Sequence, residues 1–485
     1  MNEIIIPIRG EKIMKNTSAN VQSIKDSLSL GKQRTYNEII ELLDAQWNSN
    51  LNDTSLASIT ALDKSLGYLS KKLNPIFIGG TNGKSLTLEF TKKILEHEGL
   101  TVGAFFAPHI LTYNERFCIN NEYISNKVFT ELANQVISIV EIENIVASTR
   151  DILTAMALLY FTKNNVDVAL FELEDITTAR PVTICTPHII GITRITNNQA
   201  NTNVPVSEEA IDSMLSIVKK NTHVVSADQS KLNLQSMQRI VTAMGGLWSM
   251  PIRKLATLAY PFEQLHGRCA ALAERIAQMY INSFVEEAEK ANSLLAKKKG
   301  QRGRPTLEAK RASEINPKKT IEQFWKETEN SLNGRFELLE KEKPTILLDN
   351  ASNLDAFKNL LLGIRLLHYR KQLKGLIIIL GCNNPDLDIP EFTKTLRYFF
   401  KKTSGQIIIV PVESIPGDTK SASWDIEKLT NDAKSMNIKA RSAKSVAQAF
   451  EIASKSVDDR HGLVVITGSN SVISEYWHYK GIKKI

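Results

Sequence analysis

The sequence predicts an α/β protein. Its first part is a doubly wound, mostly parallel sheet that carries a glycine-rich loop, and its second part is a Rossmann-like α/β domain. Three observations lead to this prediction. Short apolar runs alternate along the chain with stretches of helical periodicity, as in parallel sheets covered by helices. A glycine-rich segment joins one apolar run directly to a helical pattern. The alternation is interrupted near residue 284 and begins afresh after Gly334.

The first domain is expected to cover residues 35–333, after an N-terminal extension over residues 1–34. Leu86, Phe90 and Ile94 recur at helical spacing after the glycine-rich segment, and Gly99 ends that helix. With the strands on either side, this helix forms a βαβ unit. The other predicted elements are a helix from residue 35, strands at 75–78, 101–106, 166–172, 188–193 and 222–226, and helices at 151–161 and 207–220.

The second domain is expected to cover residues 334–485. A fresh series of apolar runs with helical segments between them begins here, which predicts another sheet covered by helices. Its predicted strands lie at 345–348, 376–380, 406–412 and 463–467.

Composition indicates an ordinary globular protein. With 485 residues, 42% hydrophobic and 23% charged, the chain is long enough for roughly two to four domains. The four cysteines lie far apart and form no CxxC pair, which argues against a disulfide scaffold and a structural zinc site. We find no signal-peptide pattern at the N-terminus and no apolar run long enough to span a membrane. A cytoplasmic location is therefore expected.

Basic residues concentrate in one segment. The formal net charge is +8, yet residues 297–319 alone hold nine basic and two acidic residues. We read residues 284–330 as an insert of helix, basic loop and helix. The RGRP sequence at 302–305 resembles an AT-hook core, which binds the minor groove of A·T-rich DNA. A solvated basic loop is the interpretation we favour, so nucleic-acid binding is only a third hypothesis.

The glycine-rich loop has the composition of a phosphate-binding loop. Glycines let backbone N–H groups approach phosphate oxygens, and the following helix directs its positive end toward them. The lysine can reach the outer phosphates of ATP, and the serine hydroxyl can hold Mg²⁺. The predicted nucleotide-binding residues are Gly80, Thr81, Asn82, Gly83, Lys84 and Ser85.

Glu172 ends an apolar strand in the same predicted sheet. Ligands of open α/β sheets bind beyond the carboxyl ends of the strands, so Glu172 is a candidate ligand for Mg²⁺, directly or through water. A strand-end glutamate in solvent is the alternative. For His109, contact with substrate and simple packing are both open.

Seven motifs in order resemble those of one known family. GTNGKS is followed by Ala107-Pro108-His109, by NERF with Glu115-Arg116, and by VDVALFE, which ends at Glu172. Further on come GRFE from Gly334, DNAS with Asn353, and TGS from Thr467. In this order the motifs resemble those of the folylpolyglutamate synthase/dihydrofolate synthase family of the Mur ligase superfamily.

The resemblance implies an ATP-dependent ligase of the Mur ligase type. Its members join L-glutamate to a folate or pteroate carboxylate through an acyl phosphate. By the match, Lys84 and its loop hold the β- and γ-phosphates, and Glu172 holds Mg²⁺. Lys84 and Glu172 are therefore the candidate catalytic residues. Arg335, Asp349 and Asn353 reach the nucleotide from the second domain, so domain closure would complete the site. The family also implies a monomer.

Several positions depart from the family pattern, mostly on the metal side. Leu86, Ala107, Asn198, Gln199 and Met214 replace residues that ligate or surround metal in the family, and Ser352 replaces a histidine. Neutral amide oxygens are weak ligands for Mg²⁺. We therefore expect at most one well-held Mg²⁺, through Ser85 and Glu172. Two functions remain open: a divergent active ligase, which we favour, and a nucleotide-binding pseudoenzyme with a regulatory role.

Overall fold

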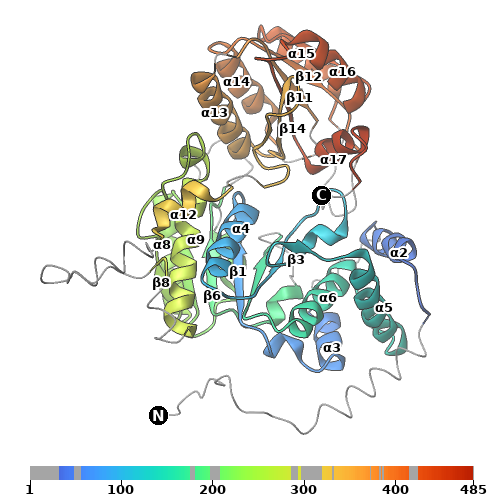
Figure 1. The fold of residues 1–485 in the computed structure, drawn as a ribbon, viewed down its shortest axis with the longest axis vertical. Coiled ribbons are helices and arrows are strands. Elements are labelled where there is room, and N and C mark those ends of the chain that lie inside the picture. Colours follow the sequence, from blue (N-terminus) through green and yellow to red (C-terminus); the bar gives the residue numbers. More distant parts are fainter. Residues whose placement is uncertain are drawn as a thin grey trace, which may run out of the picture.

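The computed structural model contains two sheets, one above the other in Figure 1, each covered by helices. We call residues 32–329 the first lobe and residues 332–483 the second lobe. The domain boundary at residue 334 stays a prediction. The structure describes residues 32–48, 56–174, 181–196, 208–285, 293–295, 319–329, 332–371, 373–381, 384, 387–413 and 424–483.

The first lobe is built on an eight-stranded sheet with the order β4-β3-β2-β5-β1-β6-β7-β8. Two short strands at one edge, β3 (Phe117–Ile119) and β4 (Glu122–Tyr123), run antiparallel to their neighbours. The others are parallel, as predicted: β1 (Pro75–Gly79), β2 (Val102–Phe105), β5 (Val168–Glu172), β6 (Ile189–Ile192), β7 (His223–Ser226) and β8 (Leu247–Ser249).

Helices cover both faces of this sheet because its strands are apolar on both sides. Alternate residues of β1 enter different cores: Phe77 packs in one, and Ile76 and Ile78 in the other. The Phe77 side is covered mainly by α2 (Tyr36–Asn48), α3 (Ala57–Ser65), α5 (Asn126–Ile142) and α6 (Thr149–Lys163), with α7 (Glu208–Leu215) and α8 (Lys231–Ala243) further along. The opposite side holds α4 (Lys84–His97), α9 (Phe262–Phe284) and α12 (Ile321–Glu327), as Figure 1 shows.

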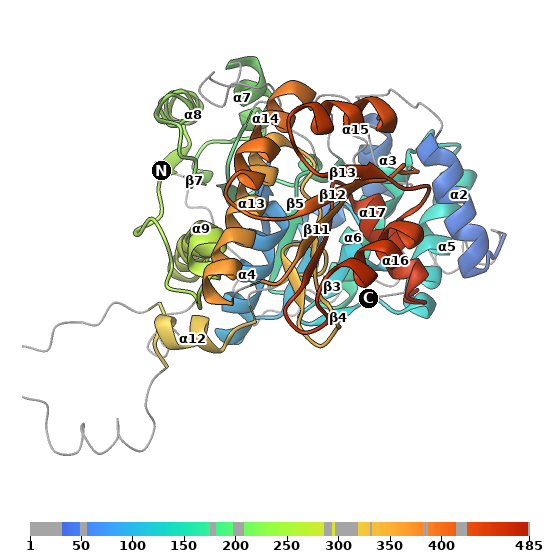
Figure 2. The ribbon, with the colours of Figure 1, turned by 90° about the horizontal axis from the view of Figure 1, so that it is seen from above.

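The second lobe has a six-stranded sheet with the order β13-β12-β11-β14-β10-β9, parallel except for β9. Figure 2 shows helices on both of its sides. One core involves α13 (Leu354–Arg370), α14 (Ile389–Phe400) and α15 (Ile426–Ser435), and the other α16 (Val446–Ser456) and α17 (Asn470–Tyr479). The strands are β9 (Glu337–Leu339), β10 (Thr345–Asp349), β11 (Leu376–Leu380), β12 (Gln406–Ile409), β13 (Ala440–Ser442) and β14 (Leu463–Thr467).

The predicted fold class is confirmed, and each predicted strand has its counterpart. Two elements were predicted to be longer than they are: the helix predicted at 207–220 ends at Leu215, and the strand predicted at 406–412 ends at Ile409. The long helix α9 and the short strands β3, β4, β8, β9 and β13 were not predicted. Most of the basic insert, including the RGRP sequence at 302–305, lies outside the described residues, although α12 falls within its predicted range.

None of the described helices combines the length and the apolar character that crossing a membrane requires.

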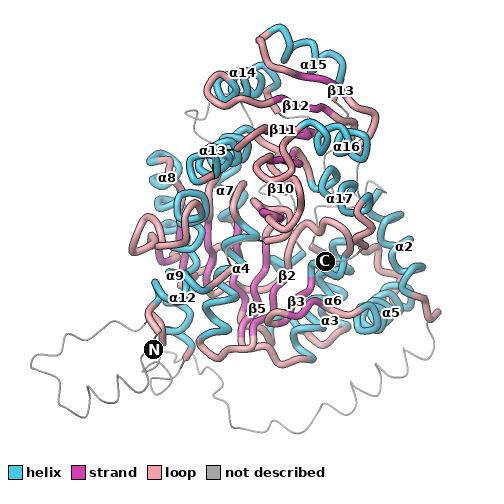
Figure 3. The backbone as a smooth tube through the Cα atoms, turned by 45° about the horizontal axis from the view of Figure 1, so that its top comes forward, coloured by secondary structure: helices cyan, strands magenta, loops and turns pink. Residues whose placement is uncertain are grey.

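The parallel arrangement of the first-lobe strands explains where a ligand can bind. Ile78 of β1 pairs with Glu172 at the end of β5, and Gly79 pairs with Ile192 at the end of β6. The loops after these three neighbouring strands therefore meet at one edge, which faces the second lobe (Figure 3).

Candidate functional site

The loop between β1 and α4 needs its two glycines. Gly80 and Gly83 have φ values of 129° and 87°, where side chains are strained. A Cβ atom on Gly80 would lie 2.1 Å from Oγ1 of Thr193, and one on Gly83 would lie 2.9 Å from Sγ of Cys269. Glycine at both positions therefore lets the backbone turn tightly against the neighbouring elements.

Hydrogen bonds fix this loop in an open turn. The Thr81 N–H donates to the Arg194 carbonyl at 2.7 Å, and the Thr196 N–H donates to Thr81 Oγ1 at 3.0 Å. Lys84 Nζ donates back to the carbonyls of Gly80 and Thr81 at 3.0 and 3.3 Å. Because Gly83 caps the 14-residue helix α4, the N–H groups of its first turn and its positive end lie at the loop.

Ser85 and Glu172 form a buried polar pair beside the loop. Ser85 Oγ donates to Glu172 Oε1 at 2.9 Å, and the Ala107 N–H donates to Glu172 Oε2 at 3.3 Å. Burial raises the pKa of Glu172, and the charges of Lys84 and Arg335 oppose that shift. The prediction that Glu172 faces the same crevice as the loop agrees with this geometry; its role as a metal ligand stays a prediction.

The second lobe contributes polar side chains from the end of β10 and the start of α13. Asp349 ends β10 and accepts hydrogen bonds from the N–H groups of Phe336 and Ala351 at 2.9 and 3.0 Å. Burial raises the pKa of Asp349 to about 6, although these bonds and the Arg335 charge act in the opposite direction. Asn353 caps α13 by accepting from the Ala356 N–H.

One cavity of about 910 Å³ lies between the lobes and brings these groups together. Nine of the ten predicted site residues line it, and Gly80 does not. Gly80 instead lies behind the loop, against Thr193. The cavity-lining residues among the predicted ones are Thr81, Asn82, Gly83, Lys84, Ser85, Glu172, Arg335, Asp349 and Asn353.

The divergent positions that the structure describes occupy two kinds of environment. Leu86, Ala107 and Ser352 line the cavity. Met214 is buried, and its Sδ would lie 3.7 Å from a Cβ atom on Gly79, at the end of the loop-bearing strand. Asn198 and Gln199 lie outside the described residues.

The donor set fits one divalent cation. A serine hydroxyl and a glutamate carboxylate, 2.9 Å apart at the cavity wall, are hard oxygen ligands of the kind that Mg²⁺ accepts, with water and phosphate oxygens completing its shell. Within the described ranges, no group of three or more His, Cys, Asp or Glu side chains could hold a metal ion. A cation here would therefore depend on the nucleotide for further ligands.

Glu174 also lines the cavity, and two arginines hold it. Arg116 Nη1 lies 2.5 Å from Glu174 Oε1, and Arg150 Nε lies 3.1 Å from Oε2. Both guanidinium groups lie over the Trp47 ring, at 5.3 and 5.4 Å from its centre. His109 does not line the cavity: its Nδ1 accepts from Arg116 Nε at 3.0 Å, which favours the packing interpretation.

Sequence reasoning missed several residues that line the cavity. Arg194 follows the end of β6, next to the loop-bearing strand, so the strand-end rule could have found it. Asp355 stands two residues after Asn353 and carried no signal of its own. The third group, Gln264, His266 and Arg268, lies on α9, the helix that was not predicted.

No family model matches the chain. Among curated proteins, the dihydrofolate synthase/folylpolyglutamate synthase of Bacillus subtilis is 30% identical over 214 residues, which are 43% of this chain and 46% of that protein. The chain thus matches less than half the length of this curated relative.

Solved structures extend the likeness of fold to nearly the whole chain. Mycobacterium tuberculosis folylpolyglutamate synthase with ADP has a TM-score of 0.71 and 17% identity, over 94% of this chain and 99% of that one. A bifunctional folylpolyglutamate synthase/dihydrofolate synthase with Mn, AMPPNP and L-glutamate bound has a TM-score of 0.65 and 18% identity, over 93% of this chain and 100% of that one. The resemblance inferred from the motifs is confirmed: in sequence and in fold, this chain is similar to the folylpolyglutamate synthase/dihydrofolate synthase family.

Proposed function

We propose that this protein is an ATP-dependent amide ligase that adds L-glutamate to a folate-type carboxylate through an acyl phosphate. One observation carries the proposal. The phosphate loop, the Ser85–Glu172 pair and the polar groups of the second lobe line a single cavity. The names of the curated relative and of the structural neighbours supply the reaction class.

The loop supplies the nucleotide end of the site. The N–H groups at the start of α4 and the Lys84 ammonium would bind the β- and γ-phosphate oxygens, where negative charge gathers during phosphoryl transfer. Mg²⁺ held by Ser85 and Glu172 would supply further neutralisation of that charge. Arg335, Asp349 and Asn353 would hold the nucleotide from the second lobe, so that its triphosphate lies between the two lobes.

The acceptor carboxylate would enter from the Ala107–Pro108 side of the cavity, next to Glu174. Two arginines hold Glu174, and Nη2 of Arg116 is buried without a hydrogen-bond partner in the described part of the chain. The two guanidinium groups balance the Glu172 and Glu174 carboxylates at this end, and the Nη2 donor of Arg116 suits an anionic acceptor. Attack of an acceptor oxygen on the γ-phosphorus would release ADP, and attack of the glutamate amine on the acyl carbon would release phosphate.

A second candidate function is nucleotide binding without turnover, in a regulatory role. The buried Met214 and the cavity-lining Leu86 and Ala107 favour it, because none of these side chains offers an oxygen ligand to Mg²⁺. Loss of a second cation would weaken charge stabilisation where the acyl phosphate forms.

Phosphate release separates the two candidates. The assay combines ATP, Mg²⁺ and L-glutamate with a dihydropteroate or tetrahydrofolate acceptor, and mass spectrometry identifies the conjugate. The ligase proposal expects phosphate and conjugate in equal amounts, both lost in Lys84→Ala. ATP binding without turnover across a broad acceptor panel would contradict the ligase and support the regulatory protein.

A further inference from the structure

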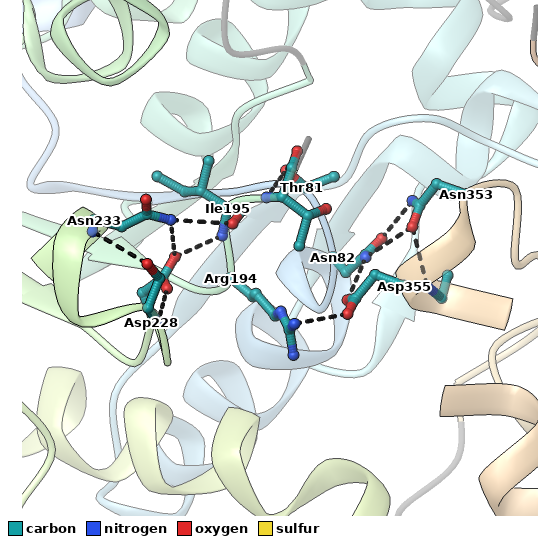
Figure 4. Close-up of polar contacts among 11 residues, drawn as sticks. Thr81, Asn82, Arg194, Ile195, Asp228, Asn233, Asn353 and Asp355 are labelled. Carbon is teal, nitrogen blue, oxygen red and sulfur yellow. Dashed lines mark hydrogen bonds and ion pairs between the residues drawn. The ribbon is translucent and has the colours of Figure 1, made fainter. Parts of the chain in front are cut away.

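The two lobes touch directly at the phosphate loop (Figure 4). The Asn82 and Asn353 side chains exchange two hydrogen bonds, at 3.1 and 2.8 Å. Asn82 Nδ2 also donates to Asp355 Oδ2 at 3.0 Å, and Arg194 Nη2 lies 2.9 Å from Asp355 Oδ1. Two first-lobe residues therefore hold two residues at the start of α13.

The first-lobe side of this contact is braced. The Arg194 carbonyl accepts from the N–H groups of Thr81 and Asn82, at 2.7 and 3.4 Å. The next residue, Ile195, donates its N–H to the buried carboxylate of Asp228 at 2.8 Å, just beyond β7. Arg194 thus holds the phosphate loop with its backbone while its side chain reaches the second lobe, as Figure 4 shows.

The second-lobe side is equally fixed. Asn353 is the capping residue of the 17-residue helix α13, and Asp355 lies in its first turn, where the helix dipole favours a negative charge. Leu354 and Phe357 of the same turn are buried in the second-lobe core. Movement of these partners would therefore move α13 and its lobe as a body.

The charged pair is partly shielded, with 33% of the Arg194 side chain and 15% of the Asp355 side chain exposed. Such shielding limits screening by water and salt, so the pair stabilises more than an ion pair at the open surface. The Arg239–Glu208 pair, at 3.0 Å with both side chains 66% exposed, provides the comparison within the first lobe.

We propose that Arg194 and Asp355, together with the Asn82–Asn353 amide pair, form an interlobe latch that sets the second lobe over the phosphate loop. Arg194 and Asp355 are then positioning residues. In its kinetic form this inference rests on the proposed ligase function, because the latch aligns Arg335 and Asp349 with the nucleotide held on the first lobe. Its structural form, the distance between the lobes, requires no turnover.

The test is a double-mutant cycle with Arg194→Met, Asp355→Asn and the double variant, and Arg239→Met as the matched control. The latch predicts that kcat falls about 10- to 100-fold in each single variant, because small misplacements carry penalties of this size. It also predicts little change in KM for ATP, and a double variant no worse than the poorer single one. Arg239→Met should match the wild type, and thermal unfolding checks that all variants fold.

Small-angle X-ray scattering provides a second test of the latch, which does not depend on enzyme activity. We expect a larger radius of gyration in Arg194→Met and Asp355→Asn than in the wild type and in Arg239→Met. An unchanged radius, or additive kinetic losses in the double variant, would overturn the latch. A wild type without ligase activity would refute the proposed function instead, and scattering alone would then decide on the latch.

Discussion

At the residue scale, glycine positions define the backbone on which the site depends. Gly468 of the TGS motif has a φ of 120°, and a Cβ atom on it would lie 2.3 Å from the Gly381 carbonyl oxygen. Gly99 also has a positive φ, of 86°, but a Cβ atom there would meet nothing within 4 Å. The two glycines therefore separate the penalty of a left-handed backbone from that of a steric clash.

We expect Gly468→Ala to lower the free energy of unfolding by ~3 kcal/mol, because a clash with backbone adds to the strain of positive φ. Gly99→Ala should lower it by only ~1 kcal/mol. Chemical denaturation of both variants measures the difference. Equal losses would show that the Gly468–Gly381 contact imposes no steric requirement.

Glu172 is the residue on which the cation site depends most. Glu172→Gln keeps the hydrogen bond that Ser85 donates but replaces a charged oxygen ligand with a neutral one, which Mg²⁺ binds weakly. We expect ATP affinity in Mg²⁺ buffer to fall at least about 10-fold, a loss of ~1.4 kcal/mol. Calorimetric titration in EDTA is the internal control, because affinity without Mg²⁺ should be unchanged. An equal loss in EDTA would mean that Glu172 acts on the nucleotide or the fold rather than through a cation.

At the scale of elements, the strand–loop–helix unit was predictable because its signals are local. Apolar runs, glycines and helical spacing stand next to one another from Pro75 to Gly99. The short edge strands gave no comparable signal, since β4 has two residues and β3 and β8 have three each. Arg194 and Asp355 were not predictable because their meeting depends on how two distant parts of the chain pack. Helix α9 was missed although it packs along α4 and buries four alanines, Ala270, Ala271, Ala273 and Ala277.

Helix α4 also carries a buried charged row that the predicted function does not use. Glu89 Oε2 pairs with Lys92 at 3.0 Å, and Glu89 Oε1 pairs with Lys93 at 3.4 Å. Burial, which the charge on Glu89 reinforces and those on Lys92 and Lys93 oppose, raises the pKa of Glu96 to about 7. The folded state holds the Glu96 proton more tightly than the unfolded chain does. Ionisation of Glu96 therefore lowers the free energy of unfolding, with its full effect above pH 7 and a vanishing effect as the pH falls toward 4.5.

We expect Glu96→Gln to raise the free energy of unfolding by ~1–2 kcal/mol at pH 8, after allowance for solvent screening. At pH 4.5 the gain should nearly vanish, because wild-type Glu96 is then protonated in the folded protein. Denaturation of both proteins at the two pH values measures the effect. A gain that does not depend on pH would contradict the assigned titration.

At the scale of the whole molecule, two sheets from opposite ends of the chain build one cavity. The family motifs made this arrangement predictable, since they placed groups from both parts on one nucleotide. The metal side was harder to predict, because the apolar side chains of Leu86 and Met214 carry no signal of a ligand for Mg²⁺.

The central claim is that a triphosphate binds the loop around Lys84 between the lobes, and calorimetric titration with ATP in Mg²⁺ buffer tests it most directly. The wild type should bind one ATP per chain. Lys84→Ala should bind at least about 10-fold more weakly, whereas Lys93→Ala, on the same helix but outside the cavity lining, should match the wild type. No ATP binding by the wild type, or equal affinity in Lys84→Ala, would contradict the claim.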